Sequence, residues 1–226
     1  MSIGDAEIKT QERVIRFFKD PEILGYQYIG NLSDYQNKNI KEDRLRQYLR
    51  LKGYADKLID AAIMQLQQEA GNLSRGVYDA NKTVYSRLKY GIPVSESPEK
   101  PPVTVQLVDE EKPLNNDFAI AEEVTVVEQS EKRPDLVVYL NGIAVAVIEL
   151  KRSSISVSEG IRQNLTNQKN SFIQSFFTTM QFCMAGNESE GLRYGTLLTG
   201  EKFYMEWKDD GFKEHEEERD PVDVRI

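Results

Sequence analysis

One stretch near the middle of the chain constrains the fold more than any other: RPDLVVYLNGIAVAVIELKRSS, residues 133–154. Two apolar runs rich in β-forming residues flank Asn141-Gly142, and Asn-Gly is the strongest short signal for a hairpin turn. Strands that are apolar on both faces lie in the centre of a sheet, between layers. The stretch therefore predicts a buried β-hairpin.

The two ends of this predicted hairpin are polar. Pro134 cannot donate to a strand ladder and fits the first position of a strand, which places Asp135 at its mouth. Glu149 and Lys151 are two residues apart, so on a strand they point to one face and Leu150 points to the other. A carboxylate is costly in such apolar surroundings unless it is paired or binds a cation.

These polar residues suggest a chemistry if they meet. If Asp135 reaches the face of Glu149, two carboxylates and a backbone carbonyl provide hard oxygen ligands suited to Mg²⁺. Lys151 then offers a positive charge to a scissile phosphate, or helps to orient or deprotonate the attacking water. This pattern indicates metal-assisted phosphodiester hydrolysis. The alternative is a structural ion pair, since an isolated Glu-x-Lys on a strand is usually one.

The register of the hairpin decides between these interpretations. A plain two-residue loop would pair Leu140 with Ile143. Asp135 would then stand opposite Ile148, and the side chains of Asp135 and Glu149 would point to opposite faces. A three-residue loop with a bulge restores the match. The nuclease interpretation therefore predicts an odd-length loop or a bulge in this hairpin.

The rest of the chain divides into two halves. Amphipathic patterns predict four helices and one short strand in the first half: helices 6–18, 39–54, 55–70 and 73–91, and strand 25–32. Residues 92–102 hold four of the eight prolines and are expected to be a linker or long loop. We expect the first helix to pack on the sheet, because a helix must bury its apolar stripe.

The second half is mostly strands. The elements predicted around the hairpin are strands 103–109 and 118–129, a helix at 156–169 capped by Ser156 or Ser158, and a closing strand pair turned at Gly200. The periodicity of residues 171–186 is ambiguous, and the polar residues 209–226 are expected to lead out of the domain. The predicted fold class is α/β (α+β), with a mixed sheet flanked by helices and a helical N-terminal half.

Composition excludes several classes of protein. No run approaches the roughly 18 apolar residues that span a bilayer, and the N-terminus has no apolar signal region. The single cysteine, Cys183, excludes a disulfide framework and fits a reducing cytoplasm. The single histidine, His215, argues against Ser-His-Asp or Cys-His catalysis. A net charge of -8 argues mildly against strong nucleic-acid binding, although a sum hides local patches.

Pro134-Asp135 followed by Glu149-Leu150-Lys151 resembles the PD-(D/E)xK nuclease signature. The wider hairpin is similar to the nuclease region of the restriction (motor) subunit of type I restriction–modification enzymes. Further stretches share this similarity: TQERVIRFF, YDANKTVYSRLKYG, NQKNSFIQSFF, AGNESEGLRYGTLLT and EKFYMEWK. The resemblance covers most of the chain. It implies a Mg²⁺-dependent DNA endonuclease, a type I site-specific deoxyribonuclease, with a restriction-endonuclease-like core.

The resemblance also implies roles for individual residues. Asp135 and Glu149 match the metal-binding carboxylates of the family, and Lys151 matches its catalytic lysine. Leu150 would lend its backbone carbonyl to the metal.

Many family members carry a Q-x-x-x-Y motif on the following helix. Gln163 matches the glutamine, but Asn167 stands where the tyrosine is expected. At i, i+4 spacing the two share a helix face, so a polar pair toward DNA is expected without the stacking or phenol chemistry of tyrosine. Glu7 and Glu12 on the first helix are either a further acid or solvated carboxylates. Three flanking arginines either touch phosphates or balance charge: Arg133, Arg152 and Arg162.

Restriction subunits of this type couple the nuclease to an ATP-driven translocase, whose phosphate loop reads G-x-x-x-x-G-K-[ST]. GNESEGLR (186–193) has the glycine spacing, but Leu192 and Arg193 stand where Lys and Ser/Thr are required, so a turn without ATP binding is expected.

The domain prediction follows from the resemblance. We expect a nuclease domain at 1–208, with a helical region at about 39–91 and a catalytic core at about 103–208 plus the first helix. Residues 209–226 are expected to be a linker toward an absent motor domain, where ATP would act. Expected partners are double-stranded DNA and, through the full-length chain, the methyltransferase and specificity subunits. The expected location is cytoplasmic, without a membrane segment.

Two alternatives stay open. The helical half is an interaction or docking module beside a degenerate nuclease site, or the chain is a repair-type nuclease of the same fold. A docking module does not need Asp135 or a metal there, and partner co-purification separates the repair enzyme. A domain fed with DNA by a motor needs little affinity of its own, so nonspecific binding is expected to be weak.

Overall fold

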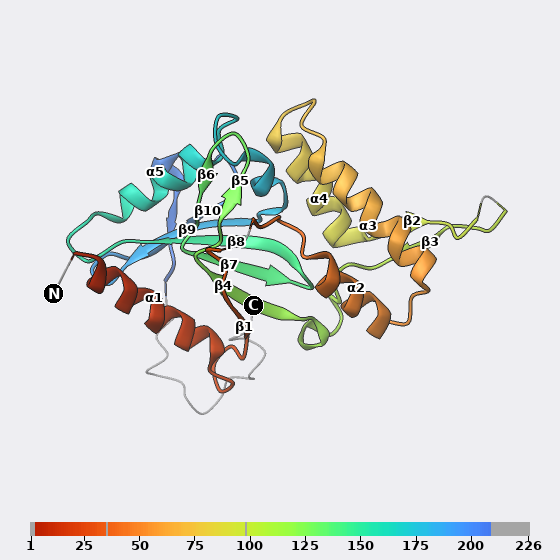
Figure 1. Cartoon of the computed structure of the whole chain (residues 1–226), viewed down its shortest axis with the longest axis horizontal. Coiled ribbons are helices and arrows are strands. Elements are labelled where there is room, and N and C mark those ends of the chain that lie inside the picture. Colours follow the sequence, from red (N-terminus) through yellow and green to blue (C-terminus); the bar gives the residue numbers. More distant parts are fainter. Residues whose placement is uncertain (1–2, 35, 98, 209–226) are drawn as a thin grey trace.

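A mixed seven-stranded sheet forms the centre of the molecule, in the order β1-β4-β7-β8-β9-β10-β11. The structure is a computed structural model that describes residues 3–34, 36–97 and 99–208 (Figure 1). The strands are β1 (Gln27–Asn31), β4 (Phe118–Glu122), β7 (Leu136–Leu140), β8 (Ile143–Leu150), β9 (Phe182–Asn187), β10 (Gly191–Gly195) and β11 (Met205–Glu206). The pairs β1–β4 and β8–β9 are parallel and the others antiparallel. The predicted fold class is confirmed.

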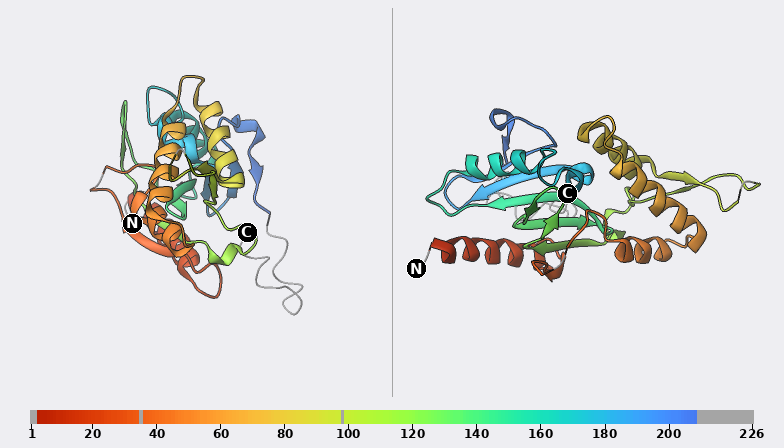
Figure 2. Two further views of the ribbon diagram at one scale, coloured as in Figure 1. Left: turned by 90° about the vertical axis from the view of Figure 1, so that its right-hand side faces the viewer. Right: turned by 45° about the horizontal axis from the view of Figure 1, so that its top comes forward.

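Two helices cover opposite faces of this sheet (Figure 2). Helix α1 (Ile3–Lys19) buries Ile15 in a cluster with residues of β4, β7 and β8, as predicted for the first helix. Helix α5 (Val157–Asn167) packs Val157 and Ile161 against Ala185 on the other face. Its N-cap is Ser156, whose side chain accepts from the Ser158 backbone N–H, so one of the two predicted caps is correct.

The helical region lies beside the sheet and has its own core. It contains α2 (Glu42–Leu51), α3 (Asp56–Gly71) and α4 (Val77–Tyr90). Helices α2 and α4 are shorter than their predicted ranges, and α3 has the predicted length but begins and ends one residue later. Leu45, Ile59 and Val84 are fully buried there, and Ile143 of β8 joins the same cluster. The helical region is therefore packed onto one end of the central hairpin.

The predicted linker at 92–102 is wrong at its start. Strand β2 (Ile92–Val94) pairs with β3 (Val103–Val105) in a hairpin that projects from the helical region (Figure 1). The predicted strand 103–109 ends early, at Val105. Ile92 and Val94 are buried and Pro93 between them is exposed. Because the proline occupies the exposed position, its missing N–H does not disturb the short strand.

The predicted strand 118–129 is also interrupted. Strand β4 ends at Glu122, and Glu123 has a left-handed backbone with φ 51°. The chain then forms a separate small hairpin of β5 (Val126–Val127) and β6 (Glu131–Lys132). The left-handed residue, which is uncommon outside glycine, turns the chain out of the main sheet.

The remaining expectations are largely met. The ambiguous stretch 171–186 contains a 3-10 helix, η2 (Gln174–Thr179), before β9. The closing strands β10 and β11 pair as predicted, although a 3-10 helix, η3 (Glu201–Phe203), follows Gly200. A third 3-10 helix, η1 (Pro113–Asn115), precedes β4. The GNESEGLR stretch is the turn between β9 and β10, as expected. Residues 209–226 lie outside the described residues.

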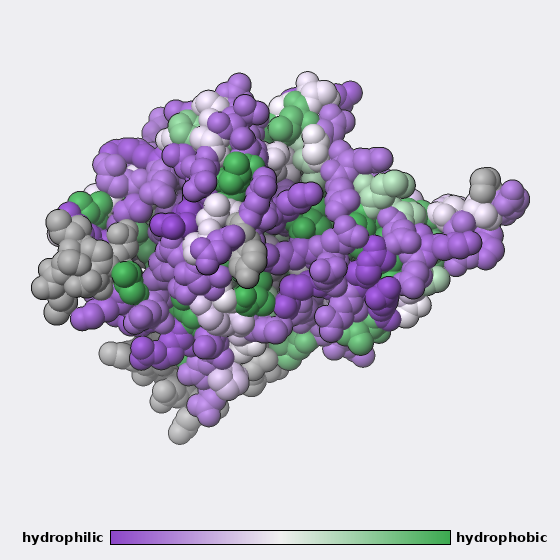
Figure 3. All heavy atoms as spheres, viewed as in Figure 1, coloured by the Kyte–Doolittle hydropathy of each residue, from purple (hydrophilic) through white to green (hydrophobic). Residues whose placement is uncertain are grey.

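The face of the molecule shown in Figure 3 is mostly hydrophilic, with small separate apolar areas. Across the described residues, no helix is both long and apolar enough to cross a bilayer.

Candidate active site

The β7–β8 hairpin has a two-residue loop and a bulge. Leu140 pairs with Ile143 across Asn141-Gly142, both of which have positive φ. The register then shifts by one residue, because Val145 of β8 has no partner on β7. This shift confirms the bulge that the nuclease interpretation requires.

The bulge brings the two carboxylates to one face. Beyond it, Leu136 pairs with Ile148, so the next pair along the ladder is Asp135 with Glu149. Directly opposed residues of an antiparallel pair share a face. The Asp135 carboxylate Oδ2 accepts a hydrogen bond from the Leu150 backbone N–H at 2.7 Å, which closes the mouth of the hairpin.

Glu149 is the most deeply buried part of the cluster. Its side chain is fully inaccessible, and its Oε2 accepts a hydrogen bond of 2.6 Å from Gln163 Nε2 on α5. No hydrogen-bond donor among the described residues reaches its Oε1. Burial and then the charge of Asp135 raise the pKa of Glu149 well above its usual value, and Lys151 acts in the opposite direction. The protein thus keeps a carboxylate where its ionised form is poorly solvated.

Helix α5 approaches Glu149 closely because it carries a glycine there. A Cβ added at Gly160 would lie 2.9 Å from the Ala185 Cβ and 3.5 Å from the Glu149 Cβ. The close approach brings Gln163, one turn further on, within hydrogen-bonding distance of the carboxylate. The predicted polar residue of the Q-x-x-x-Y position therefore contacts the site directly.

Lys151 and Leu150 meet at the end of β8. The Lys151 ammonium Nζ donates to the Leu150 carbonyl oxygen at 3.0 Å. This is the oxygen that, by the family resemblance, is expected to bind a metal ion. The structure thus brings together the side chains of Asp135, Glu149 and Gln163 with the end of β8.

An open groove of about 520 Å³ leads to this cluster. Its walls are Lys132, Lys151, Ile155 and five residues of α5: Glu159, Arg162, Gln163, Thr166 and Asn167. Asn167 is only 2% exposed and lines the groove on the same helix as Gln163, as the i, i+4 spacing predicts. A smaller hollow, lined by Leu24, Leu114 and their neighbours, does not include any residue of the cluster.

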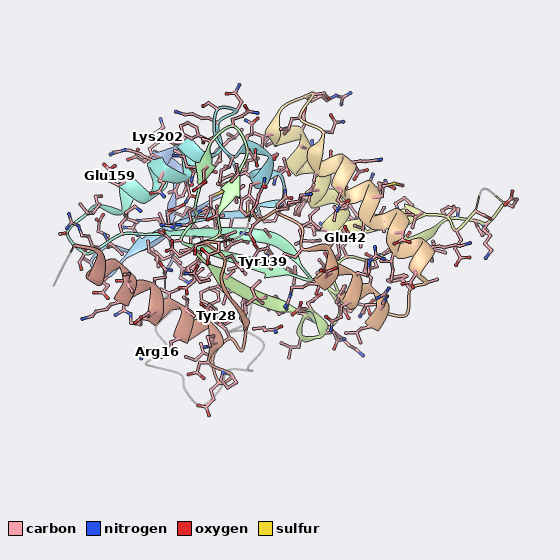
Figure 4. All side chains as sticks on the ribbon, in the orientation of Figure 1. Arg16, Tyr28, Glu42, Tyr139, Glu159 and Lys202 are labelled. Carbon is pink, nitrogen blue, oxygen red and sulfur yellow. The ribbon has the colours of Figure 1, made fainter. Side chains whose placement is uncertain are left out.

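A network from α1 was missed at the sequence level. Gln11 is nearly buried, and its Nε2 donates to Glu122 Oε2 at 2.9 Å and to Glu123 Oε1 at 3.2 Å. The Tyr28 hydroxyl donates to Glu122 Oε1 at 2.6 Å, and burial and this bond raise the pKa of Tyr28 to about 12. Figure 4 labels Tyr28 on the α1 side of the sheet. The Glu123 N–H donates to the Asp135 carbonyl at 2.8 Å, which ties this network to the cluster.

The residue of α1 that contacts this network is Gln11, and not one of the two candidate acids of the first helix, Glu7 and Glu12. Glu12 is exposed, and the side chain of Glu7 lies outside the described part of the chain. Gln11 reaches the sheet because it lies on the buried face of α1 beside Thr10. The periodicity of α1 indicates that Gln11 lies on the buried face of the helix. It does not indicate that the partners of Gln11 are Glu122 and Glu123.

Two flanking arginines balance charge. Arg133 pairs with Glu123 at 2.7 Å. Arg162 pairs with Glu159 at 2.7 Å and with Glu201 at 2.9 Å. For these two residues the contacts favour the charge-balancing interpretation.

The cluster fits a divalent cation that takes few of its ligands from the protein. Within the described residues no three His, Cys, Asp or Glu side chains form a group that could hold a metal. The protein ligands of a cation here would be Asp135, Glu149 and the Leu150 carbonyl, with water completing the shell. The Glu149 oxygen without a donor is the atom that such a cation would satisfy.

Comparison with known families identifies the chain. A family model described as the type I restriction enzyme R protein N terminus matches residues 7–203. No curated protein sequence matches the chain.

Proposed function

Because the chain belongs to the family of type I restriction enzyme R protein N-terminal domains, we propose that it is the DNA-cutting module of such an enzyme. The reaction is Mg²⁺-dependent hydrolysis of DNA phosphodiester bonds by a PD-(D/E)xK site. The carboxylates are Asp135 and Glu149, and the lysine is Lys151.

One observation carries this proposal. The unmatched Val145 puts Asp135 and Glu149 on the same face, where a plain hairpin would separate them. The result is a buried carboxylate oxygen without a donor, beside a second carboxylate and a main-chain carbonyl. A purely structural role does not explain this arrangement, because an apolar residue at position 149 would stabilise the fold better than a buried carboxylate.

The chain's own residues divide the work. The Leu150 N–H fixes the Asp135 carboxylate, and Gln163 fixes one oxygen of Glu149. Lys151 carries a positive charge at the end of β8, where it can face a phosphate or orient the attacking water. Bound Mg²⁺ would generate the nucleophile from water and neutralise charge on the phosphate. The ammonium of Lys151 rests on the Leu150 carbonyl, so it and a cation compete for this oxygen.

The finer assignments form part of the proposal. Residues 1–208 form the nuclease domain, and residues 209–226 connect it to a motor region that binds ATP. The substrate is double-stranded DNA, and the methyltransferase and specificity subunits are partners through the longer chain. The family supports the assignment to a restriction system.

The decisive experiment uses the full-length R protein reassembled with its partners. Lys151→Ala is compared with wild type for DNA cleavage and ATP hydrolysis in the same reaction. Cleavage should fall by about 100-fold or more while ATP hydrolysis persists, because loss of a positioned charge or proton-transfer group has effects of this size. Lys57→Gln, on the exposed surface of α3, is the control and should leave both activities unchanged. Undiminished cleavage by Lys151→Ala would make the cluster structural.

A docking role for the helical region is the second candidate. Apolar side chains on α2–α4 are at least half exposed: Leu51, Met64, Tyr78 and Tyr85. Such side chains favour contact with another protein surface. The two roles are compatible, and Asp135→Ala separates them, because it should abolish cleavage and leave assembly of the enzyme intact.

A further inference from the structure

The small β5–β6 hairpin is fixed to the segment that follows α5. The Glu128 carboxylate accepts hydrogen bonds from the backbone N–H groups of Ser175 at 3.0 Å and Phe176 at 2.9 Å. The Gln129 N–H donates to the Phe172 carbonyl at 3.2 Å. The hairpin is therefore held across the groove from α5, although it lies outside the main sheet.

Lys132 at the end of this hairpin carries a charge that no carboxylate of the described residues neutralises. Its Nζ lies 4.7 Å from the ring centroid of Phe172. Arg162 on the opposite wall is paired with Glu159 and Glu201. A cation over an aromatic ring keeps its charge, and its N–H groups can still donate to an anion.

The groove between Lys132 and α5 adjoins the cluster of Asp135, Glu149 and Lys151 at one end. Lys151 and Gln163 line both, so a chain of phosphates lying in the groove would pass beside Lys151. Its volume of about 520 Å³ accommodates part of the backbone of one nucleic-acid strand. Figure 1 shows the hairpin and α5 on the same side of the sheet.

The chemistry of the lining favours recognition of the backbone. The uncharged polar groups along α5 are the amides of Gln163 and Asn167 and the hydroxyl of Thr166. Amides, hydroxyls and lysines are typical contacts to phosphate and sugar. The lining contains no aromatic side chain on which bases could stack.

We propose that the β5–β6 hairpin and α5 clamp the sugar–phosphate backbone of one DNA strand, with Lys132 bound to a phosphate next to the one that faces Lys151. This inference rests on the proposed nuclease function and adds to it the way in which the cut strand is held. The site holds one strand of the duplex by its backbone, without reading its bases. Lys132 is a positioning residue, since it binds the strand and does not touch the reacting atoms.

The test measures binding, separately from cleavage. A fluorescein-labelled oligothymidylate of about 12 nucleotides is titrated with the 226-residue chain in EDTA. Anisotropy is recorded at salt concentrations from about 20 to 200 mM. Lys132→Gln should raise the Kd by about five-fold or more at the lowest salt and reduce the salt slope by about 0.7, the loss of one single-strand phosphate contact. Lys132→Arg, which keeps the charge and the ring contact, should bind within about two-fold of wild type.

The controls separate this inference from the proposed function. Lys57→Gln removes one charge from α3, far from the groove in sequence, and should leave the Kd and the salt slope unchanged. The inference is overturned if Lys132→Gln behaves as Lys57→Gln does, or if wild type does not bind the oligonucleotide at the lowest salt. If Lys132→Gln binds normally while Lys151→Ala abolishes cleavage in the reassembled enzyme, only the clamp is wrong. If Lys151→Ala still cleaves, the nuclease assignment is itself wrong.

Discussion

At the scale of single residues, the surroundings of two glutamates, Glu149 and Glu69, shift the pKa of the carboxyl group in opposite directions. Glu149 is fully buried with one donor, Gln163, and its pKa is raised by burial. Burial opposes ionisation of Glu69 as well, but hydrogen bonds from Arg87 and Gln65 outweigh it and lower its pKa. The first carboxylate is kept at a cost in stability, and the second joins α3 to α4.

One substitution at both positions should therefore have opposite effects. Glu149→Gln should raise the free energy of unfolding by about 1–3 kcal/mol, because it removes a buried carboxylate with an unsatisfied oxygen. Glu69→Gln should lower it by about 1 kcal/mol, because an ion pair at the helix surface is lost. Urea unfolding at pH 7 measures both changes. A loss of stability in Glu149→Gln as large as that in Glu69→Gln would show that the buried carboxylate is not costly.

The pH dependence of Glu69 follows from the direction of its pKa. Because the pKa is lowered in the folded state, the stabilisation is present above the ordinary glutamate pKa of about 4.3 and is lost as pH falls through the lower folded value. The difference in stability between wild type and Glu69→Gln should shrink as the pH falls below about 4. A difference that stays constant down to acid unfolding would exclude the ion pair as its source.

At the scale of elements, the turn of the central hairpin is where the helical region attaches. The Lys41 N–H donates to the Gly142 carbonyl at 2.7 Å, and the Ala144 N–H donates to Asn39 at 2.8 Å. A Cβ at Gly142 would lie 2.7 Å from Leu45 N and from Lys41 O. The start of α2 is thus packed against the turn itself.

Two glycines with the same backbone conformation test this attachment. Gly142 has φ +83° and Gly53 has φ +85°, but nothing lies within 4 Å of a Cβ at Gly53. Gly53→Ala should cost about 1 kcal/mol, from the left-handed backbone alone. Gly142→Ala should cost about 2–3 kcal/mol more, because α2 or the turn must move. Thermal unfolding of the two variants gives the comparison, and equal losses would show that the turn is open.

The sequence predicted those elements whose signals are local. The helices follow from the periodicity of apolar residues, and the turn follows from the Asn-Gly pair. The need for a bulge follows from the spacing of Asp135 and Glu149, which puts them on opposite faces of a regular hairpin. The break at Glu123 does not, because apolar β-formers continue after it and the bond that fixes it comes from Asp135, twelve positions later. Gln11 was missed for the same reason, since its partners are 111 and 112 positions away. Such contacts exist only after the sheet has formed.

At the scale of the whole molecule, charge limits what the chain binds alone. The net charge is -8, and two cations near the cluster, Arg133 and Arg162, are paired with carboxylates of the same chain. We expect duplex DNA to bind weakly, with an affinity that is already low at about 50 mM salt and is lost by about 200 mM, because few phosphate contacts are available. The anisotropy of a labelled duplex measures this affinity at each salt concentration, and the single-stranded oligonucleotide assay is run beside it for comparison. Tight binding that resists salt would contradict the view that other parts of the enzyme deliver the DNA.

The unmatched Val145 sets a condition on transplanting this site. Residues 143–144 keep the alternation set by the turn, and residues 146–150 follow the opposite alternation. A designer who grafts Asp135 and the Glu-Leu-Lys triplet onto a regular hairpin would place the two carboxylates on different sides of the sheet. The smallest portable unit is therefore the whole hairpin with its extra residue. A single-residue deletion between turn and triplet would change the parity again and should be as damaging as loss of a carboxylate.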